Sequence, residues 1–172
     1  MISKKMTAQL NEQMKNEFFS AYFYLSMAAW FSAKNLDGFA NWFTVQAQEE
    51  RDHALLIMNY VGRVGAKVEF LPIEAPKTGF ESPLDICKKT LSHEQLVTSM
   101  IYKLMDTAQE ERDYKTIQFL QWFVNEQVEE EENASGLIER LKTAGASEAG
   151  ILYMDSELAA RVYTPTTTTS AT

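Results

Sequence analysis

Residues 43–57 read FTVQAQEERDHALLI, and this stretch decides the fold. At spacings of three and four its inner positions are Phe43, Gln46, Glu50, His53 and Ile57. This stripe is apolar at its ends and polar in its middle, which predicts a helix with one buried face. Glu50 and His53 lie three residues apart on that same face. Because an unpaired carboxylate is costly to bury, this pair indicates a helical core that holds positive charge.

The periodicity of the hydrophobic residues, together with the capping and helix-breaking residues between the periodic segments, predicts five helices along the chain. The expected ranges are about 3–34, 37–64, 83–112, 113–144 and 147–162. Ser82 followed by Pro83 is a typical helix start, and Asp113 is placed to cap the fourth helix. Residues 66–83 carry three prolines and no helical period, which predicts a connection long enough to run the length of a bundle.

Composition favours one all-α domain. The chain has 172 residues, 45% of them apolar, with only seven glycines and four prolines, and strand-like runs are scarce. We expect a domain over residues 1–163 and a disordered Thr-rich tail over 164–172.

Charge and cysteine content narrow the classes of partner and compartment. A net charge of -8 with scattered Lys and Arg argues against nucleic-acid binding. The sequence shows no leader and no membrane-spanning apolar run, and its single cysteine, Cys87, suits a reducing compartment. We therefore expect a cytoplasmic protein.

The other three long helices also place an acid on the face that they bury. These acids are Glu17, Glu94 and Glu130. Since all lie within about two turns of their helix midpoints, they are predicted at a similar depth to Glu50 and His53. No Lys or Arg lies on the buried faces of these four helices. Two divalent ions, iron or manganese rather than copper or structural zinc, would balance the carboxylates.

Alternatives remain for the individual residues. A single glutamate on a stripe is often an interface residue, and the run Glu129–Glu132 is compatible with a solvated acidic face. His93 is about 100° from the Glu94 face and is assigned to the surface. All four long helices interrupt their apolar face with an acid at a similar depth, and this coincidence favours a metal centre over a purely structural bundle.

The chain resembles the non-haem ferritins of bacteria and archaea over residues 1 to about 162. The motifs that carry the resemblance are LNEQ (10–13) with Glu17, SAY (20–22), QEERDH (48–53), FLQWF (119–123) and EQVEEE (126–131). The resemblance implies a ferritin-like four-helix bundle, with a long crossover between the second and third helices and a short fifth C-terminal helix.

The resemblance also implies roles for particular residues. Glu17, Glu50 and His53 would bind the first ferroxidase iron, and Glu50, Glu94 and Glu130 the second. A third iron site would contain Glu49, Glu126 and Glu129 together with Glu130. Gln127 would lie beside the second iron, and Tyr24 would hydrogen-bond at the site and supply an electron.

By the same resemblance the chain is a ferroxidase that stores and detoxifies iron. It would oxidise Fe(II) with O2 or H2O2 and keep the ferric mineral inside a 24-subunit homo-oligomeric shell, with the fifth helix at the fourfold axes. A non-storage di-iron redox enzyme, of peroxidase or oxygenase type, is the alternative. No haem is expected, because Arg51, Gln127 and Glu130 stand where haem-binding relatives differ. Ile117 and Leu120 replace acidic pore residues of animal ferritins, which leaves the iron entry route open.

Overall fold

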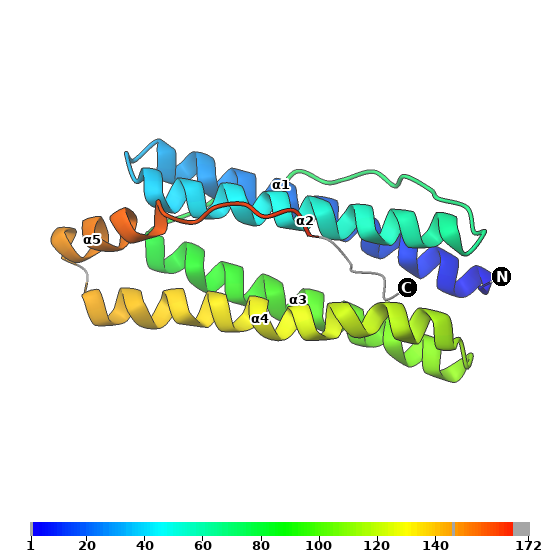
Figure 1. The fold of residues 1–172 in the computed structure, drawn as a ribbon. Coiled ribbons are helices and arrows are strands. Elements are labelled where there is room, and N and C mark those ends of the chain that lie inside the picture. The colour runs from blue at the N-terminus through cyan, green and yellow to red at the C-terminus, as the bar shows by residue number, and fades with distance from the viewer. Residues whose placement is uncertain (1, 146, 167–172) are drawn as a thin grey trace. The chain divides into compact units, whose positions relative to one another are not determined.

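The computed structural model describes residues 2–145 and 147–166, and every regular element among them is a helix (Figure 1). The helices are α1 (Lys4–Ser32), α2 (Asp37–Arg63), α3 (Pro83–Glu110), α4 (Tyr114–Ala144) and α5 (Glu148–Leu158). The all-α prediction is confirmed. None of these helices combines the length and the apolar run that crossing a bilayer requires.

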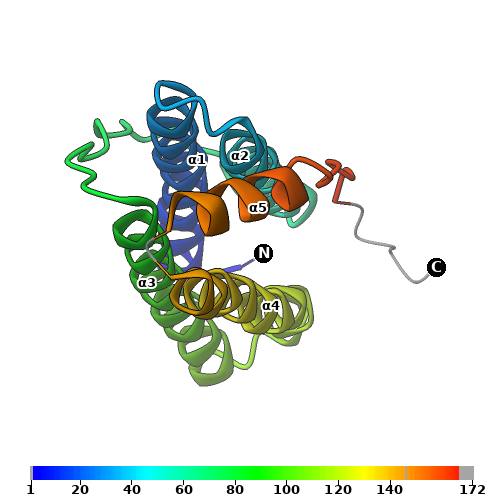
Figure 2. The same ribbon diagram turned by 90° about the vertical axis from the view of Figure 1, so that its left-hand side faces the viewer.

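The chain divides into two compact units. Among the described residues, the α1–α2 unit contains 10–78 and 154–166, and the α3–α4 unit contains 2–9, 79–145 and 147–153. In each unit two long helices lie side by side as a hairpin (Figure 2).

Aromatic packing holds the α1–α2 hairpin together near its turn. The ring of Phe31 stacks on Phe39 and Phe43, with centroids 4.8 and 5.4 Å apart, and Tyr24 lies 6.0 Å from Phe43. All four side chains are fully buried, so each removes a large apolar surface from water. The turn itself is made by Asn35, which has a positive φ of 56°.

The α3–α4 unit begins and turns at the predicted caps. The Ser82 hydroxyl accepts a hydrogen bond from the Asp85 amide at 3.1 Å, and Pro83 occupies the first turn of α3. The Asp113 carboxylate accepts one from the Thr116 amide at 3.3 Å at the start of α4. These side chains satisfy amides that have no partner inside their own helix.

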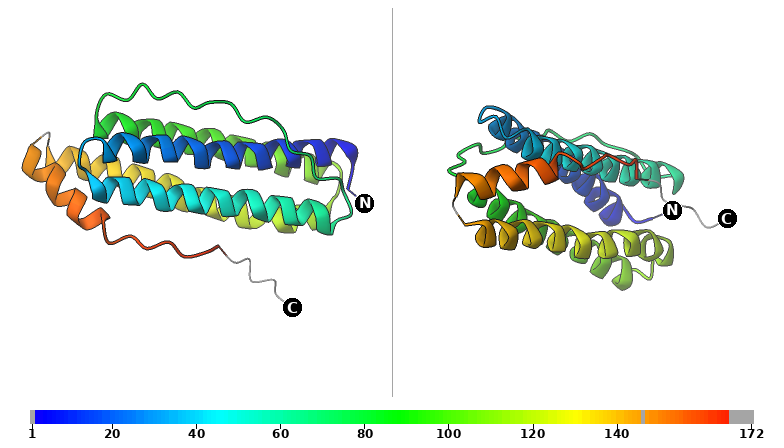
Figure 3. Two further views of the ribbon diagram at one scale, coloured as in Figure 1. Left: turned by 90° about the horizontal axis from the view of Figure 1, so that it is seen from above. Right: turned by 60° about the vertical axis from the view of Figure 1, so that its left-hand side comes forward.

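The connection after α2 runs back along the hairpin (Figure 3). The buried Asn11 side chain fixes it, since its amide donates to Lys67 O at 2.9 Å and its oxygen accepts from Glu69 N at 3.1 Å. One α1 side chain thus holds irregular backbone that makes no helical hydrogen bonds of its own.

The fifth helix differs from its prediction in length. It ends at Leu158 rather than near Val162, and Asn41 Nδ2 donates to Arg161 O at 2.9 Å just beyond it. Met154 and Leu158 are buried within the chain, whereas Leu152 is 53% exposed. Asp155 Oδ1 accepts from Phe39 N at 2.9 Å, so α5 caps the first turn of α2.

Residues 159–166, the C-terminal arm, follow α5 and lie along α2 (Figure 1). Of the predicted disordered tail, residues 167–172 lie outside the described residues. The backbone amide of Thr166, the last described residue, donates to Asp52 Oδ2 at 3.1 Å. The division of the chain into one domain and a tail stays a prediction.

Candidate metal centre

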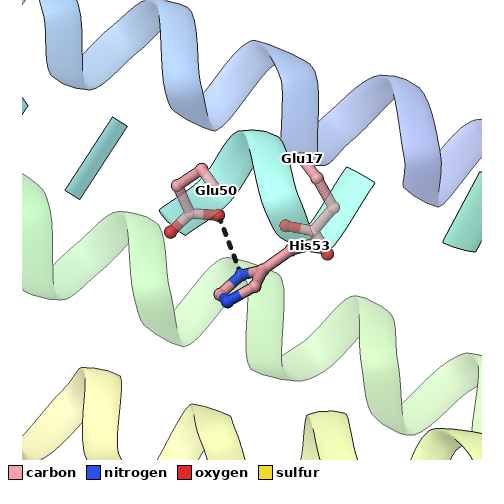
Figure 4. Close-up of side chains that lie close together, drawn as sticks. All are labelled: Glu17, Glu50 and His53. Carbon is pink, nitrogen blue, oxygen red and sulfur yellow. Dashed lines mark ion pairs between the residues drawn. The ribbon is translucent and has the colours of Figure 1, made fainter. Parts of the chain in front are cut away.

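Glu17, Glu50 and His53 come together in the interior of the α1–α2 unit (Figure 4). Each offers one ligand atom, and these atoms lie within 4.8 Å of one another. His53 Nδ1 is 3.4 Å from Glu50 Oε2. At 1%, 2% and 1% exposure, the three side chains are as inaccessible as the apolar core around them.

Helical spacing explains the cluster. Glu50 and His53 are three residues apart on α2 and so project from one face toward α1. Glu17 projects from α1, and Gln13 one turn earlier donates from Nε2 to Glu17 Oε1 at 2.8 Å. This bond fixes the carboxylate that faces the α2 pair.

Burial raises the pKa of Glu17 above its usual range, because the charged form loses its hydration. The nearby His53 and the hydrogen bond from Gln13 lower the pKa but do not offset the burial. A divalent cation would favour the ionised form of both carboxylates. Two carboxylates and an imidazole also form a donor set that suits iron, so the residues present fit the predicted ion.

Glu94 and Gln127 form a second polar cluster inside the α3–α4 unit. Gln127 Nε2 lies 3.2 Å from both Glu94 Oε2 and Glu94 O, and 3.3 Å from Thr98 Oγ1. Glu130, one turn further along α4, is buried like Glu94. That Glu94 and Glu130 join Glu17, Glu50 and His53 in one di-iron centre stays a prediction.

Two residues of this cluster have no role in the sequence prediction. Thr98 Oγ1 donates to Glu131 Oε1 at 2.6 Å, although Glu131 is expected to point into solvent. Spacing offered a signal in both cases, since Thr98 is one turn after Glu94 and Glu131 one turn after Gln127. Thr98 and Glu131 therefore extend the hydrogen-bonded cluster from Glu94 through Gln127.

The remaining predicted site residues differ in exposure. Tyr24 is fully buried two turns after Glu17 on the same helix. Glu49 is partly buried and ion-paired with Arg161. Glu126 is half-buried and Glu129 exposed. Their predicted roles, as ligands of a third iron or as an electron donor, stay predictions.

Two titratable side chains of the α3–α4 unit are withdrawn from solvent to different degrees, since Cys87 is fully buried and His93 is only partly buried. His93 is half-buried rather than on the surface as expected, and burial lowers its pKa to about 4. Burial raises the pKa of the Cys87 thiol to about 12. Both side chains are therefore uncharged near pH 7.

The sequence matches a family model described as the ferritin-like domain over residues 7–144. It is 42% identical to the bacterial non-heme ferritin of Staphylococcus aureus over 163 residues, covering 95% of this chain and 98% of that protein. The corresponding protein of Staphylococcus haemolyticus is 43% identical over 164 residues, with the same coverage.

Solved archaeal structures resemble the whole fold. An open-pore ferritin from Archaeoglobus fulgidus has a TM-score of 0.93 at 41% identity, covering 94% of this chain and all of that one. A closed form of the Archaeoglobus fulgidus ferritin, engineered by mutagenesis, has a TM-score of 0.94 at 42% identity, covering 95% and 100%. The predicted fold, a four-helix bundle with a short C-terminal helix, is confirmed by this likeness.

Proposed function

Because the chain belongs to the ferritin-like family, we propose that it stores and detoxifies iron by oxidising Fe(II) at an internal ferroxidase centre. The observation that carries this proposal is the buried cluster of Glu17, Glu50 and His53, whose ligand atoms lie within 4.8 Å of one another. Three metal-binding groups buried together in a helical core have no structural purpose that matches their cost.

Iron is the substrate of this centre. The first Fe(II) binds Glu17, Glu50 and His53, and the second binds Glu94 and Glu130 while sharing Glu50. Gln127 positions Glu94 through the hydrogen bond at 3.2 Å. Tyr24, two turns from Glu17, is the proposed electron donor of the site.

The paired arrangement matches the electron demand of the oxidant. Two Fe(II) ions lose one electron each, and the two electrons with two protons reduce O2 to H2O2. A second pair of Fe(II) ions reduces H2O2 to water in the same way. Carboxylate oxygens are hard donors and stabilise Fe(III) more than Fe(II), which favours the products.

Storage requires a closed assembly in addition to the centre. We propose that the chain forms a 24-subunit shell, whose cavity holds the ferric mineral, in the cytoplasm. No haem takes part, since Arg51, Gln127 and Glu130 occupy the positions at which haem-binding relatives differ.

Aerobic Fe(II) titration of the purified protein tests the proposal. Absorbance follows oxidation, and sedimentation follows the size of the assembly and the iron that travels with it. Glu50→Ala and His53→Ala should abolish the fast phase of oxidation, since each removes a ligand of the first ion. Both variants should keep their helical content or gain a little stability without metal, because a buried polar group is removed.

Glu12→Ala is the matched control, since Glu12 lies on α1 but is half-exposed and pairs with Lys15. It should oxidise iron at the parental rate. A parental rate in Glu50→Ala would refute the site. Fast oxidation by a monomer or dimer that retains no iron would instead favour a di-iron redox enzyme.

A further inference from the structure

The Glu49 carboxylate, a predicted ligand of the third iron, already has a cationic partner from its own chain. Arg161 Nη2 of the C-terminal arm forms an ion pair with Glu49 Oε2. Both side chains are mostly buried, at 21% and 22% exposure. An ion pair with this little solvent contact is screened less than one at the surface.

Other contacts fix the guanidinium of Arg161 over α2. Its Cζ lies 4.4 Å from the ring centroid of Trp42, a cation–π geometry. Its Nη1 donates to Gln46 Oε1 at 3.0 Å and to Trp42 O at 3.3 Å. Trp42, Gln46 and Glu49 are spaced by four and three residues, so they lie on one stripe of α2 that contacts this side chain.

Residues on both sides of Arg161 hold the arm in place. Asn41 Nδ2 donates to the Arg161 carbonyl at 2.9 Å. Tyr163 donates from its hydroxyl to Asp52 Oδ2 at 2.6 Å, and Arg51 donates to that hydroxyl at 3.2 Å. The arm is therefore anchored along α2 from Asn41 to Asp52.

We propose that Arg161 takes the place of the third iron at Glu49, so that the chain binds a third ion tightly only when the arm leaves α2. The inference rests on the proposed function, since it concerns a cation next to the ferroxidase ligands. A guanidinium and a divalent ion on one carboxylate repel each other, and in a partly buried site this repulsion is weakly screened. The C-terminal arm thereby regulates how many ions the inner acids hold.

Calorimetric titration of the metal-free, assembled protein with Zn2+, which has no redox chemistry, tests this inference. The wild type should bind two ions per chain tightly. Arg161→Gln should bind a third at least tenfold more tightly than the wild type does. The gain should disappear in the double variant Arg161→Gln/Glu49→Gln, which lacks the carboxylate that the removal of Arg161 makes available.

Arg63→Gln is the matched control. It removes the same charge from α2, but Arg63 lies in the last turn of the helix, 14 residues from Glu49. Its third-ion affinity should stay at the wild-type level. An equal gain in Arg63→Gln would assign the effect to overall charge and overturn the inference.

Two further outcomes separate the inference from the proposed function. A wild type that binds three ions tightly, and loses one on Glu49→Gln, would overturn the role of Arg161 while leaving the ferroxidase centre intact. If the Glu50→Ala variant binds the two ions as tightly as the wild type does, the proposed centre would instead be refuted.

Discussion

At the residue scale, neighbouring acids on α2 have separate tasks because they point in different directions. Glu50 turns inward to Glu17 and His53, whereas Asp52 turns to the C-terminal arm. Burial opposes ionisation of Asp52, but hydrogen bonds from Tyr163, Arg51 and the Thr166 amide outweigh it and lower its pKa. The charge at Asp52 therefore fastens the arm and is not available to the metal cluster.

Cys87 gives a pH-dependent prediction. Burial raises its pKa to about 12, above the value of about 8.5 expected in the unfolded chain. The folded state therefore holds the proton more tightly. The stability that this contributes is complete below about pH 8.5 and is lost as the pH rises toward 12, by up to about 1.4 kcal/mol per pH unit.

Urea denaturation of the wild type and of Cys87→Ala at pH 7 and pH 10 checks this. The alanine variant is less stable at pH 7, because a buried group is lost, and the difference should narrow at pH 10. Parallel pH profiles for the two proteins would contradict the argument.

The burial of each inward-facing acid was predictable from its own helix, but the long-range contacts of the site residues were not. Glu17, Glu50, Glu94 and Glu130 are all buried as the interrupted stripes indicate. The partner of Glu49 is 112 residues away, at a position that the sequence pattern assigned to the fifth helix, so no local pattern reports the contact. Periodicity records which face of a helix is buried but contains no information about distant irregular segments.

At the element scale, three helix ends share one backbone motif. The residue after the last turn has a positive φ at Asn35 (56°), Gly65 (74°) and Arg112 (53°). In each case the next amide bonds back to the carbonyl five residues earlier, at 3.1, 3.1 and 2.8 Å. This is the Schellman arrangement, which satisfies carbonyls that the helix leaves open.

Gly65 and Gly62 form a matched pair for testing that motif. Neither would meet an atom within 4 Å if a Cβ were added, but only Gly65 has a positive φ. Gly65→Ala should lower the free energy of unfolding by about 1 kcal/mol through left-handed strain. Gly62→Ala, inside α2, should raise it by roughly 0.5–1 kcal/mol. Urea denaturation measures both, and changes of the same sign would refute the motif.

The starts of α3 and α4 were predictable from their capping residues, whereas the end of α5 was not predictable from the sequence. Ser82 and Asp113 cap the helices that they predict. The hydrophobic pattern of the fifth helix continues to Val162, but contacts with α2 end the helix at Leu158. Gly38 permits this approach, since a Cβ there would lie 1.6 Å from Asp155 O. A tertiary contact thus overrides the local pattern.

At the scale of the whole molecule, fold class and family were predictable because helix lengths, the long connection and the interrupted stripes agree with one another. Which apolar side chains remain exposed on the surface was less predictable. Although the fifth helix is predicted at the fourfold axes of a shell, its Met154 and Leu158 are buried within the chain. Apolar exposure remains elsewhere, since Tyr22 and Leu25 of α1 are 52% and 48% exposed.

Tyr22 and Leu25 are three residues apart and share one face of α1, which an isolated chain would leave in water. If that face is a subunit contact of the proposed shell, Leu25→Lys should leave the helical content unchanged but reduce the sedimenting mass toward the 19.6 kDa of one chain. Leu25→Ala, which adds no charge, should assemble at least in part. Fe(II) oxidation should persist in the dissociated lysine variant, because Glu17, Glu50 and His53 belong to one chain, while ferric iron precipitates for lack of a cavity. A full-sized assembly of Leu25→Lys would place the subunit contacts on another face.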